Sequence, residues 1–186
     1  MEERGNIIKI LEKTKKAIKN QEVLILKELS DRTIHTASIS QDPDNIAIAV
    51  NVYSLSKIIQ KKETEKDKNW NKLISNFILF IDGALNALKK DDLEKFRKEL
   101  NYLRKEINKF SPNFKQQIKD VFRKASINKA SKIYEHGISM EKTASLLGIT
   151  MFELASYAGQ TNVSDVRESK TMDVKSRIKL AMDMFK

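Results

Sequence analysis

Three basic side chains in the stretch 112–136 have a spacing that suits contact with phosphate. Lys115, Lys119 and Arg123 recur every four residues, and Lys124 lies beside them. In a helix the first three share one face, because residues four apart are neighbours on the helix surface. Such a stripe can follow the backbone of a nucleic acid, although lysine-rich helices more commonly present a solvated face. We predict that these four residues contact phosphates.

Asp31 and His35 are the second candidate pair. They are four residues apart in the stretch 28–55, which is acidic in a chain whose formal net charge is +10. Histidine carries protons near neutral pH and often binds metals. One Asp–His pair does not make a metal site, and the only other histidine, His136, is remote in the sequence. We expect a capping or hydrogen-bonded structural role here, and the role of the acidic stretch stays open.

No stretch has the pattern of a known catalytic site. A nucleophile elbow, a P-loop, an HExxH zinc motif and a dinucleotide-binding glycine pattern are all missing from the sequence. The absence of cysteine excludes disulfides and thiolate metal sites and fits a reducing cytosol. We therefore expect a cytoplasmic protein that is not an enzyme and uses no cofactor or metal. The apolar runs are too short to span a bilayer, so we expect no membrane partner.

Helices must position these side chains, because 186 residues with only two Pro and five Gly favour an all-α fold. Apolar periodicity predicts helices at 4–19, 21–38, 43–62, 68–90, from an Asp91–Glu94 capping box to Lys109, and at 112–136. The pairs Asp42-Pro43 and Ser111-Pro112 are typical helix starts. Because 43–62 is apolar nearly all round, we expect it to be the central buried helix.

The stretch 134–161 predicts a helix-turn-helix. Ser139 can cap a helix that Gly148 ends, and Thr150 with Glu153 forms a capping box for a second helix that Gly159 ends. The residues expected in the core of this motif are Ala144, Gly148, Ile149, Leu154 and Tyr157. We predict a helical bundle at 1–111 and a helix-turn-helix region at 112–186, the two forming either separate units or one continuous domain. Helix-turn-helix pairs are typical of DNA readers.

The second helix of this motif is poorly suited to reading bases. The residues expected to face a groove are Thr150, Met151, Phe152, Ser156 and Gln160. Base edges are usually read by Arg, Lys, Asn or Gln, and Met151–Ala158 has none of these. The alternative is that Met151 and Phe152 pack on the bundle or on a partner protein.

Residues 132–159, KIYEHGISMEKTASLLGITMFELASYAG, resemble the core of small prokaryotic helix-turn-helix antitoxins that are paired with PIN-domain toxins. The residues that carry the resemblance are Tyr134, Gly137, Ser139, Lys142, Ala144, Leu147, Gly148 and Glu153. Members of that family are small, whereas a long helical region precedes the motif here. The resemblance implies DNA binding for autoregulation and contact with a PIN-domain ribonuclease.

A last amphipathic helix is expected from Thr171 or Asp173 onward. Its apolar stripe consists of Val174, Ile178, Ala181, Met182 and Phe185. This stripe must be buried on the bundle or across a homodimer interface. Two functions follow from the sequence: a DNA-binding regulator of antitoxin type, or a non-enzymatic helical adaptor whose helix-turn-helix binds protein.

Overall fold

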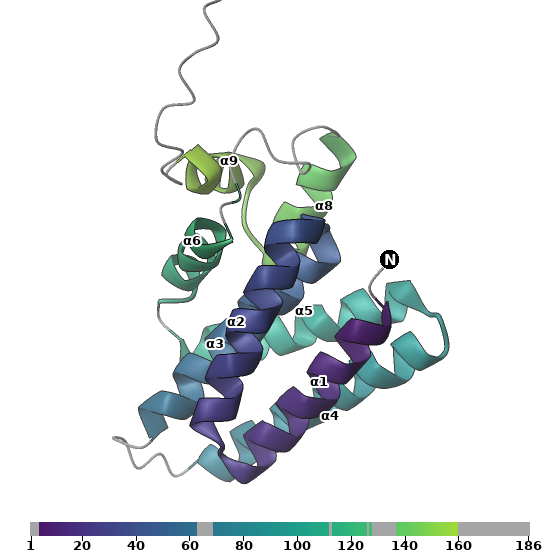
Figure 1. The fold of residues 1–186 in the computed structure, drawn as a ribbon, viewed down its shortest axis with the longest axis vertical. Helices are drawn as coiled ribbons and strands as arrows, with labels where there is room; N and C mark the ends of the chain where they lie inside the picture. Colours follow the sequence, from purple (N-terminus) through teal and green to yellow (C-terminus); the bar gives the residue numbers. More distant parts are fainter. Residues whose placement is uncertain (1–3, 63–68, 112, 126, 128–136, 160–186) are drawn as a thin grey trace, which may run out of the picture.

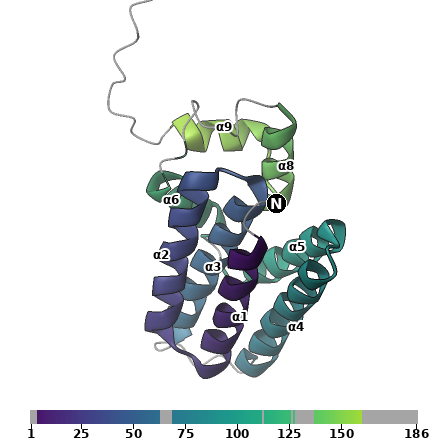
Figure 2. The same cartoon turned by 45° about the vertical axis from the view of Figure 1, so that its right-hand side comes forward.

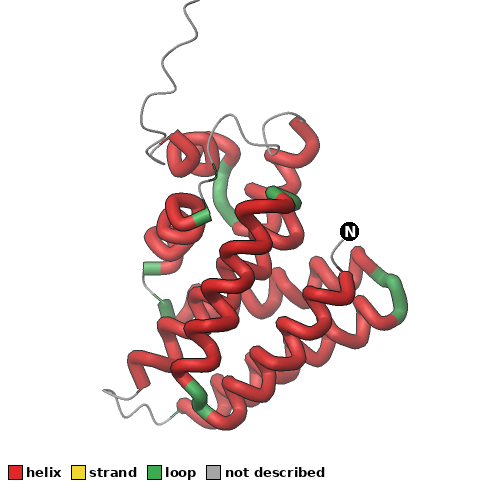
Figure 3. The backbone as a smooth tube through the Cα atoms, in the orientation of Figure 1, coloured by secondary structure: helices red, strands yellow, loops and turns green. Residues whose placement is uncertain are grey.

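A computed structural model describes residues 4–62, 69–111, 113–125, 127 and 137–159. These residues form helices and short connections without any strand, which confirms the predicted all-α class (Figure 3). The helices are α1 (Arg4–Asn20), α2 (Val23–Ser40), α3 (Pro43–Lys62), α4 (Trp70–Lys89), α5 (Leu93–Phe110), α6 (Phe114–Lys124), α8 (Gly137–Leu147) and α9 (Met151–Gly159).

The centre of the molecule is α3. Every residue from Asp44 to Ser56 is buried, and the helix packs against α2, α5, α6 and α8. The apolar run Ile46–Val50 covers all sides of the helix, so it needs neighbours on all sides. The prediction of a central buried helix is confirmed.

The remaining bundle helices extend the fold beyond α3: α5 packs on α3, and α4 packs on α1 and α5. Figures 1 and 2 show α1 lying between α2 and α4, with α4 and α5 paired as a hairpin. The apolar face of α1 turns inward, where Ile7, Ile10 and Leu11 are at most 3% exposed. Burial of one such side chain stabilises the fold by about 1.5–3 kcal/mol. The polar face of α1 is left on the outside of the molecule.

A two-pronged ion pair joins α5 to the start of α3. The Arg97 guanidinium donates to both carboxylate oxygens of Asp44, at 2.8 and 2.7 Å. The Asp44 side chain is 3% exposed, so this carboxylate depends on its partner, because an unpaired buried charge is very costly. Its place in the first turn of α3 also suits the positive end of the helix dipole.

Predicted helix starts at Asp42, Asp91 and Ser111 have different outcomes. Asp42 caps α3 as predicted, since its Oδ1 accepts from the Asp44 N–H at 2.9 Å. The Asp91 prediction is wrong: Asp91 has a left-handed φ of 62°, and Asp92 caps α5 by accepting from the Lys95 N–H. The Ser111 prediction is also wrong, because Ser111 ends α5 and α6 begins only at Phe114.

Other sequence predictions fall partly or wholly beyond the described ranges. The helix expected at 112–136 ends at Lys124, and residues 128–136 lie outside them. The amphipathic helix expected at 171–186 also lies outside. Ser139 lies inside α8, which begins at Gly137, so its expected role as the cap residue is wrong. The division at residue 111 stays a prediction, although α8 packs on both α3 and α5 of the expected bundle.

In the part of the chain that the structure describes, no helix combines the length and the apolar character needed to cross a bilayer.

Candidate functional site

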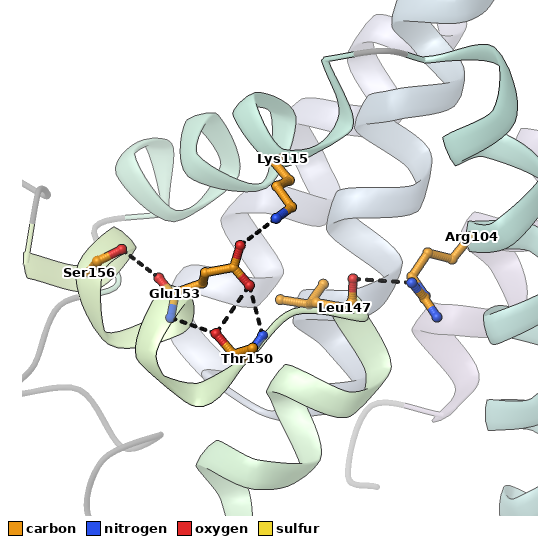
Figure 4. Close-up of polar contacts among 6 residues, drawn as sticks. All are labelled: Arg104, Lys115, Leu147, Thr150, Glu153 and Ser156. Atoms are coloured by element: carbon orange, nitrogen blue, oxygen red, sulfur yellow. Dashed lines mark hydrogen bonds and ion pairs between the residues drawn. The ribbon is translucent and has the colours of Figure 1, made fainter.

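The candidate site is the turn between α8 and α9, together with α5 and α6, which contact it. Gly148 has a φ of +65°, as predicted for the residue that ends α8. Its N–H donates to the Ser145 carbonyl at 3.1 Å, and the Ile149 N–H donates to the Ala144 carbonyl at 3.0 Å. This paired arrangement is the Schellman ending of a helix, which satisfies carbonyls that the last turn would otherwise leave unbonded. The turn leads the chain from Leu147 at the end of α8 to Thr150 at the start of α9, as Figure 4 shows.

Arg104 of α5 contacts the turn at the C-terminal end of α8. Its Nη1 lies 3.5 Å from the Leu147 carbonyl oxygen, at the negative end of α8, and its Nη2 donates to Asn101 (Figure 4). Burial lowers the pKa of this guanidinium. A Cβ at Gly148 would collide with the Arg104 head group. Gly148 is therefore required for its φ and also for the space that it leaves.

A reciprocal capping box starts α9, as the sequence predicts. The Glu153 N–H donates to Thr150 Oγ1 at 3.1 Å, and the Thr150 N–H donates to Glu153 Oε2 at 2.9 Å. The Thr150 hydroxyl donates to the same carboxylate oxygen. Two N–H groups that have no carbonyl partner at a helix start are satisfied in this way.

The N-terminal part of α6 is tied to α9 by charge. Lys115 Nζ donates to Glu153 Oε1, as Figure 4 shows. This ammonium, with the Thr150 hydrogen bonds, lowers the pKa of Glu153 to about 2. One turn further on, Lys119 Nζ lies 5.1 Å from the centroid of the Tyr157 ring, a cation–π contact. The face of α6 that carries these two lysines is turned toward α9.

The predicted phosphate stripe is therefore divided among different contacts. Lys115 and Lys119 contact α9, while Lys124 Nζ lies 4.7 Å from the ring centroid of Tyr53 on α3. Arg123 is exposed and has no ion pair among the described residues. The structure does not present the four side chains together as one outward row, and their contact with phosphate stays a prediction.

Of the five residues predicted for the motif core, three are buried, Ile149 is partly buried, and Gly148 is exposed in the turn. Ala144, Leu154 and Tyr157 are at most 5% exposed, and Ile149 packs against the core from the turn. Burial is the main cause of the raised pKa of Tyr157. α8 packs on α3 and α5, and α9 packs on α6. The turn is therefore held by the bundle on one side and by α6 on the other.

Two apolar side chains are exposed on α9. Phe152 is 84% exposed and Met151 is 48% exposed, at the N-terminal end of α9. Thr150 uses its hydroxyl in the capping box, and Ser156 Oγ donates to the Glu153 carbonyl at 2.8 Å. Gln160 lies outside the described residues. Phe152 is too exposed to be packed on the described part of the bundle, and contact of this end of α9 with a groove or with a partner protein stays a prediction.

Asp31 and His35 do not form a bonded pair in the structure. Both are exposed, and with Asn6, Arg32 and Thr36 they line an open depression between α1 and α2. The described part of the chain holds no group of three or more His, Asp or Glu side chains that could bind a metal ion.

Lysines that the sequence reading did not single out lie on the outside of α1. Lys15 Nζ donates to Asp82 at 2.6 Å, and Lys89 Nζ donates to Glu12 at 2.9 Å, across the contact between α1 and α4. These pairs border an open groove of about 360 Å³, which Lys16 and Lys19 also line. The signal in the sequence is the repeat of lysine at 9, 13, 16 and 19, which one helix face collects.

No protein-family model matches the chain, and neither a curated protein nor a solved structure matches it. The resemblance to antitoxins stays a prediction.

Proposed function

We propose that this chain is a non-enzymatic DNA-binding protein that grips the phosphate backbone of a duplex. Charge is the observation that supports this function. The acidic side chains Glu12, Asp44, Asp82, Asp91, Glu106 and Glu153 are each paired with a cation. The whole chain nevertheless keeps a formal net charge of +10. Cations beyond those needed inside the fold are the usual mark of a protein that binds a polyanion.

The binding is to the backbone and not to base edges. α9 carries no Arg, Lys, Asn or Gln, and the hydroxyls of Thr150 and Ser156 donate within α9. Backbone contacts position a protein on DNA but carry no direct sequence information. In this proposal the α8–α9 pair is a helix-turn-helix of a regulator that binds duplexes of different sequence with similar affinity.

The test is the binding of labelled duplex DNA to the full chain, followed by fluorescence anisotropy at several salt concentrations. For about four phosphate contacts, affinity should fall about 100-fold between about 50 and about 200 mM salt. Two duplexes of unrelated sequence should give dissociation constants within about threefold of each other, because each wrong base costs a base reader about 1–3 kcal/mol. An absence of binding at the lowest salt would overturn the proposed function.

The second candidate function is protein docking through α9. Its supporting observation is the exposure of Phe152 and Met151, since a large apolar side chain left in water favours burial against a partner. We take a second copy of this chain as the partner, because the sequence predicts an apolar stripe at 174–185 that a homodimer interface would bury. A PIN-domain ribonuclease is the heterologous partner that the antitoxin resemblance suggests.

A further inference from the structure

We infer that the outer face of α1, not α6, is the surface that takes the phosphate backbone; this inference rests on the proposed function. Among the residues of α1 that are exposed, four are lysines: Lys9, Lys13, Lys16 and Lys19. Their spacing places them on one side of the helix, because residues three and four apart are neighbours. We call these four residues the α1 lysine row.

The two carboxylates that line the groove with Lys16 and Lys19 are already neutralised. Glu12 is the only acidic residue of α1, and it accepts from Lys89 of α4. Asp82, across the groove, accepts from Lys15. The lysines of the row have no ion pair with any described residue. Their charge is therefore available to an external anion, and the groove beside Lys16 and Lys19 lets one approach closely.

The lysines of α6 already have partners within the fold, which favours α1 as the phosphate-binding helix. Lys115 is bonded to Glu153, and Lys119 and Lys124 lie over aromatic rings. A phosphate that binds at α6 must compete with these contacts, whereas one that binds at the α1 lysine row displaces only water and counterions. The release of counterions from the nucleic acid is the main driving force for such binding.

The length of the row suits a nucleic-acid strand. From Lys9 to Lys19 the helix advances about 15 Å, at 1.5 Å per residue. One strand of a B-form duplex presents a phosphate about every 3.4 Å along its axis, so a row of this length passes about four phosphates.

The chemistry of the face favours duplex DNA over a membrane or a single strand. The exposed residues of α1 include no apolar or aromatic side chain, and its apolar residues Ile7, Ile10 and Leu11 are buried in the core. Stable binding to a bilayer surface adds inserted apolar groups to the attraction of lysines for anionic lipid, and binding to single strands uses rings on which bases stack. The α1 lysine row, with Glu12 beside it, provides neither.

The experiment compares three variants of the full chain that lose the same charge on different helices. The first is K9Q/K13Q/K16Q on α1. The matched control is K95Q/K98Q/K105Q on α5, where all three lysines are exposed and have no ion pair among the described residues. The third is K115Q/K119Q/R123Q on α6. Circular dichroism checks that each variant keeps its helix content. The affinity of each variant for a DNA duplex of random sequence is then measured at several salt concentrations.

We expect the α1 variant to lose about tenfold or more in affinity at low salt, and its log–log salt slope to become shallower by about three, because three phosphate contacts are removed. The α5 control should bind less than threefold more weakly than the wild type, with a nearly unchanged slope. Equal losses in the α1 and α5 variants, or a larger loss in the α6 variant, would overturn the inference.

The failures of the two proposals are distinguishable. If the wild type does not bind duplex DNA at any salt concentration, the proposed function itself is wrong. If the wild type binds anionic phosphatidylserine vesicles but not DNA, and K9Q/K13Q/K16Q abolishes that binding, the row is a membrane contact and the assignment to nucleic acid is wrong.

Discussion

Gly148 and Arg104 act as a pair at the turn between α8 and α9. Replacement of Gly148 by Ala should destabilise the protein for two reasons. A non-glycine residue in the left-handed region costs about 1–2 kcal/mol. The new Cβ also displaces the Arg104 head group, which then loses its contact with the Leu147 carbonyl, a loss of about 1 kcal/mol more. Urea unfolding of the wild type and of Gly148→Ala measures the sum.

The control for this prediction is the same change made in an Arg104→Ala background. The collision is absent there, so Gly148→Ala should cost only the backbone part, and the two substitutions should be non-additive by about 1 kcal/mol. Equal costs in the two backgrounds would show that Arg104 does not restrict the turn.

At the level of single residues, the sequence predicts Gly148 well and gives no sign of Arg104. A glycine that follows the last apolar position of a helix has a local cause that can be read from neighbours in the chain. Arg104 is distant in the sequence and reaches the turn only because α5 packs against α8. Local sequence likewise does not predict the exposure of Phe152, because it does not reveal whether the bundle covers that face of the helix.

Among the elements, α9 is the helix whose attachment depends on charge. Glu153 has its pKa lowered to about 2, chiefly by Lys115. Between the ordinary pKa of a glutamate and this value, the unfolded chain binds more protons than the folded chain, so this contribution to stability falls as the pH falls. Glu153→Gln keeps a side chain that can complete the capping box but removes the charge.

The expected result is a difference in urea midpoint between the wild type and Glu153→Gln that is largest near neutral pH and shrinks as the pH falls from about 5 to about 2. Lys115→Gln should reduce the wild-type pH dependence over the same range, because it removes the largest cause of the shift. A difference that stays constant from neutral pH to about 2 would show that the ion pair does not stabilise α9.

The helices themselves were predicted more reliably than their contacts. The apolar run Ile46–Val50 predicted the buried α3 because all-round apolar character has one structural solution. The start predicted at Asp91 is misplaced because the adjacent Asp92 caps α5, and the start predicted at Ser111 is misplaced because this residue ends α5. The sequence predicts that Lys115, Lys119 and Arg123 share a helix face. It does not predict that α9 packs against α6, because that contact depends on the tertiary fold.

The basic residues of α1 and the exposed apolar residues of α9 lie on different parts of the molecule. α1 carries six Lys or Arg and one Glu, whereas α9 carries one Glu, no cation and two exposed apolar residues, Met151 and Phe152. Figure 2 shows the two helices in different parts of the molecule, α9 across one end and α1 along the bundle. A polyanion on α1 and a protein on α9 would therefore not compete for the same surface.

The oligomeric state tests whether a second copy of the chain binds the exposed apolar residues of α9. If a second copy covers α9, the wild type should sediment as a dimer at concentrations of tens of micromolar, and Phe152→Asp should weaken association by about tenfold or more, because one buried phenylalanine contributes about 1.5–3 kcal/mol. The matched control is Leu79→Asp on α4, which removes another apolar side chain that is 64% exposed and should leave the dimer intact.

A wild type that sediments as a monomer throughout, or equal weakening by both variants, would rule out self-association through α9. Because both substituted residues are exposed, circular dichroism should show the same helix content in all three proteins, so a change in sedimentation reports association and not unfolding.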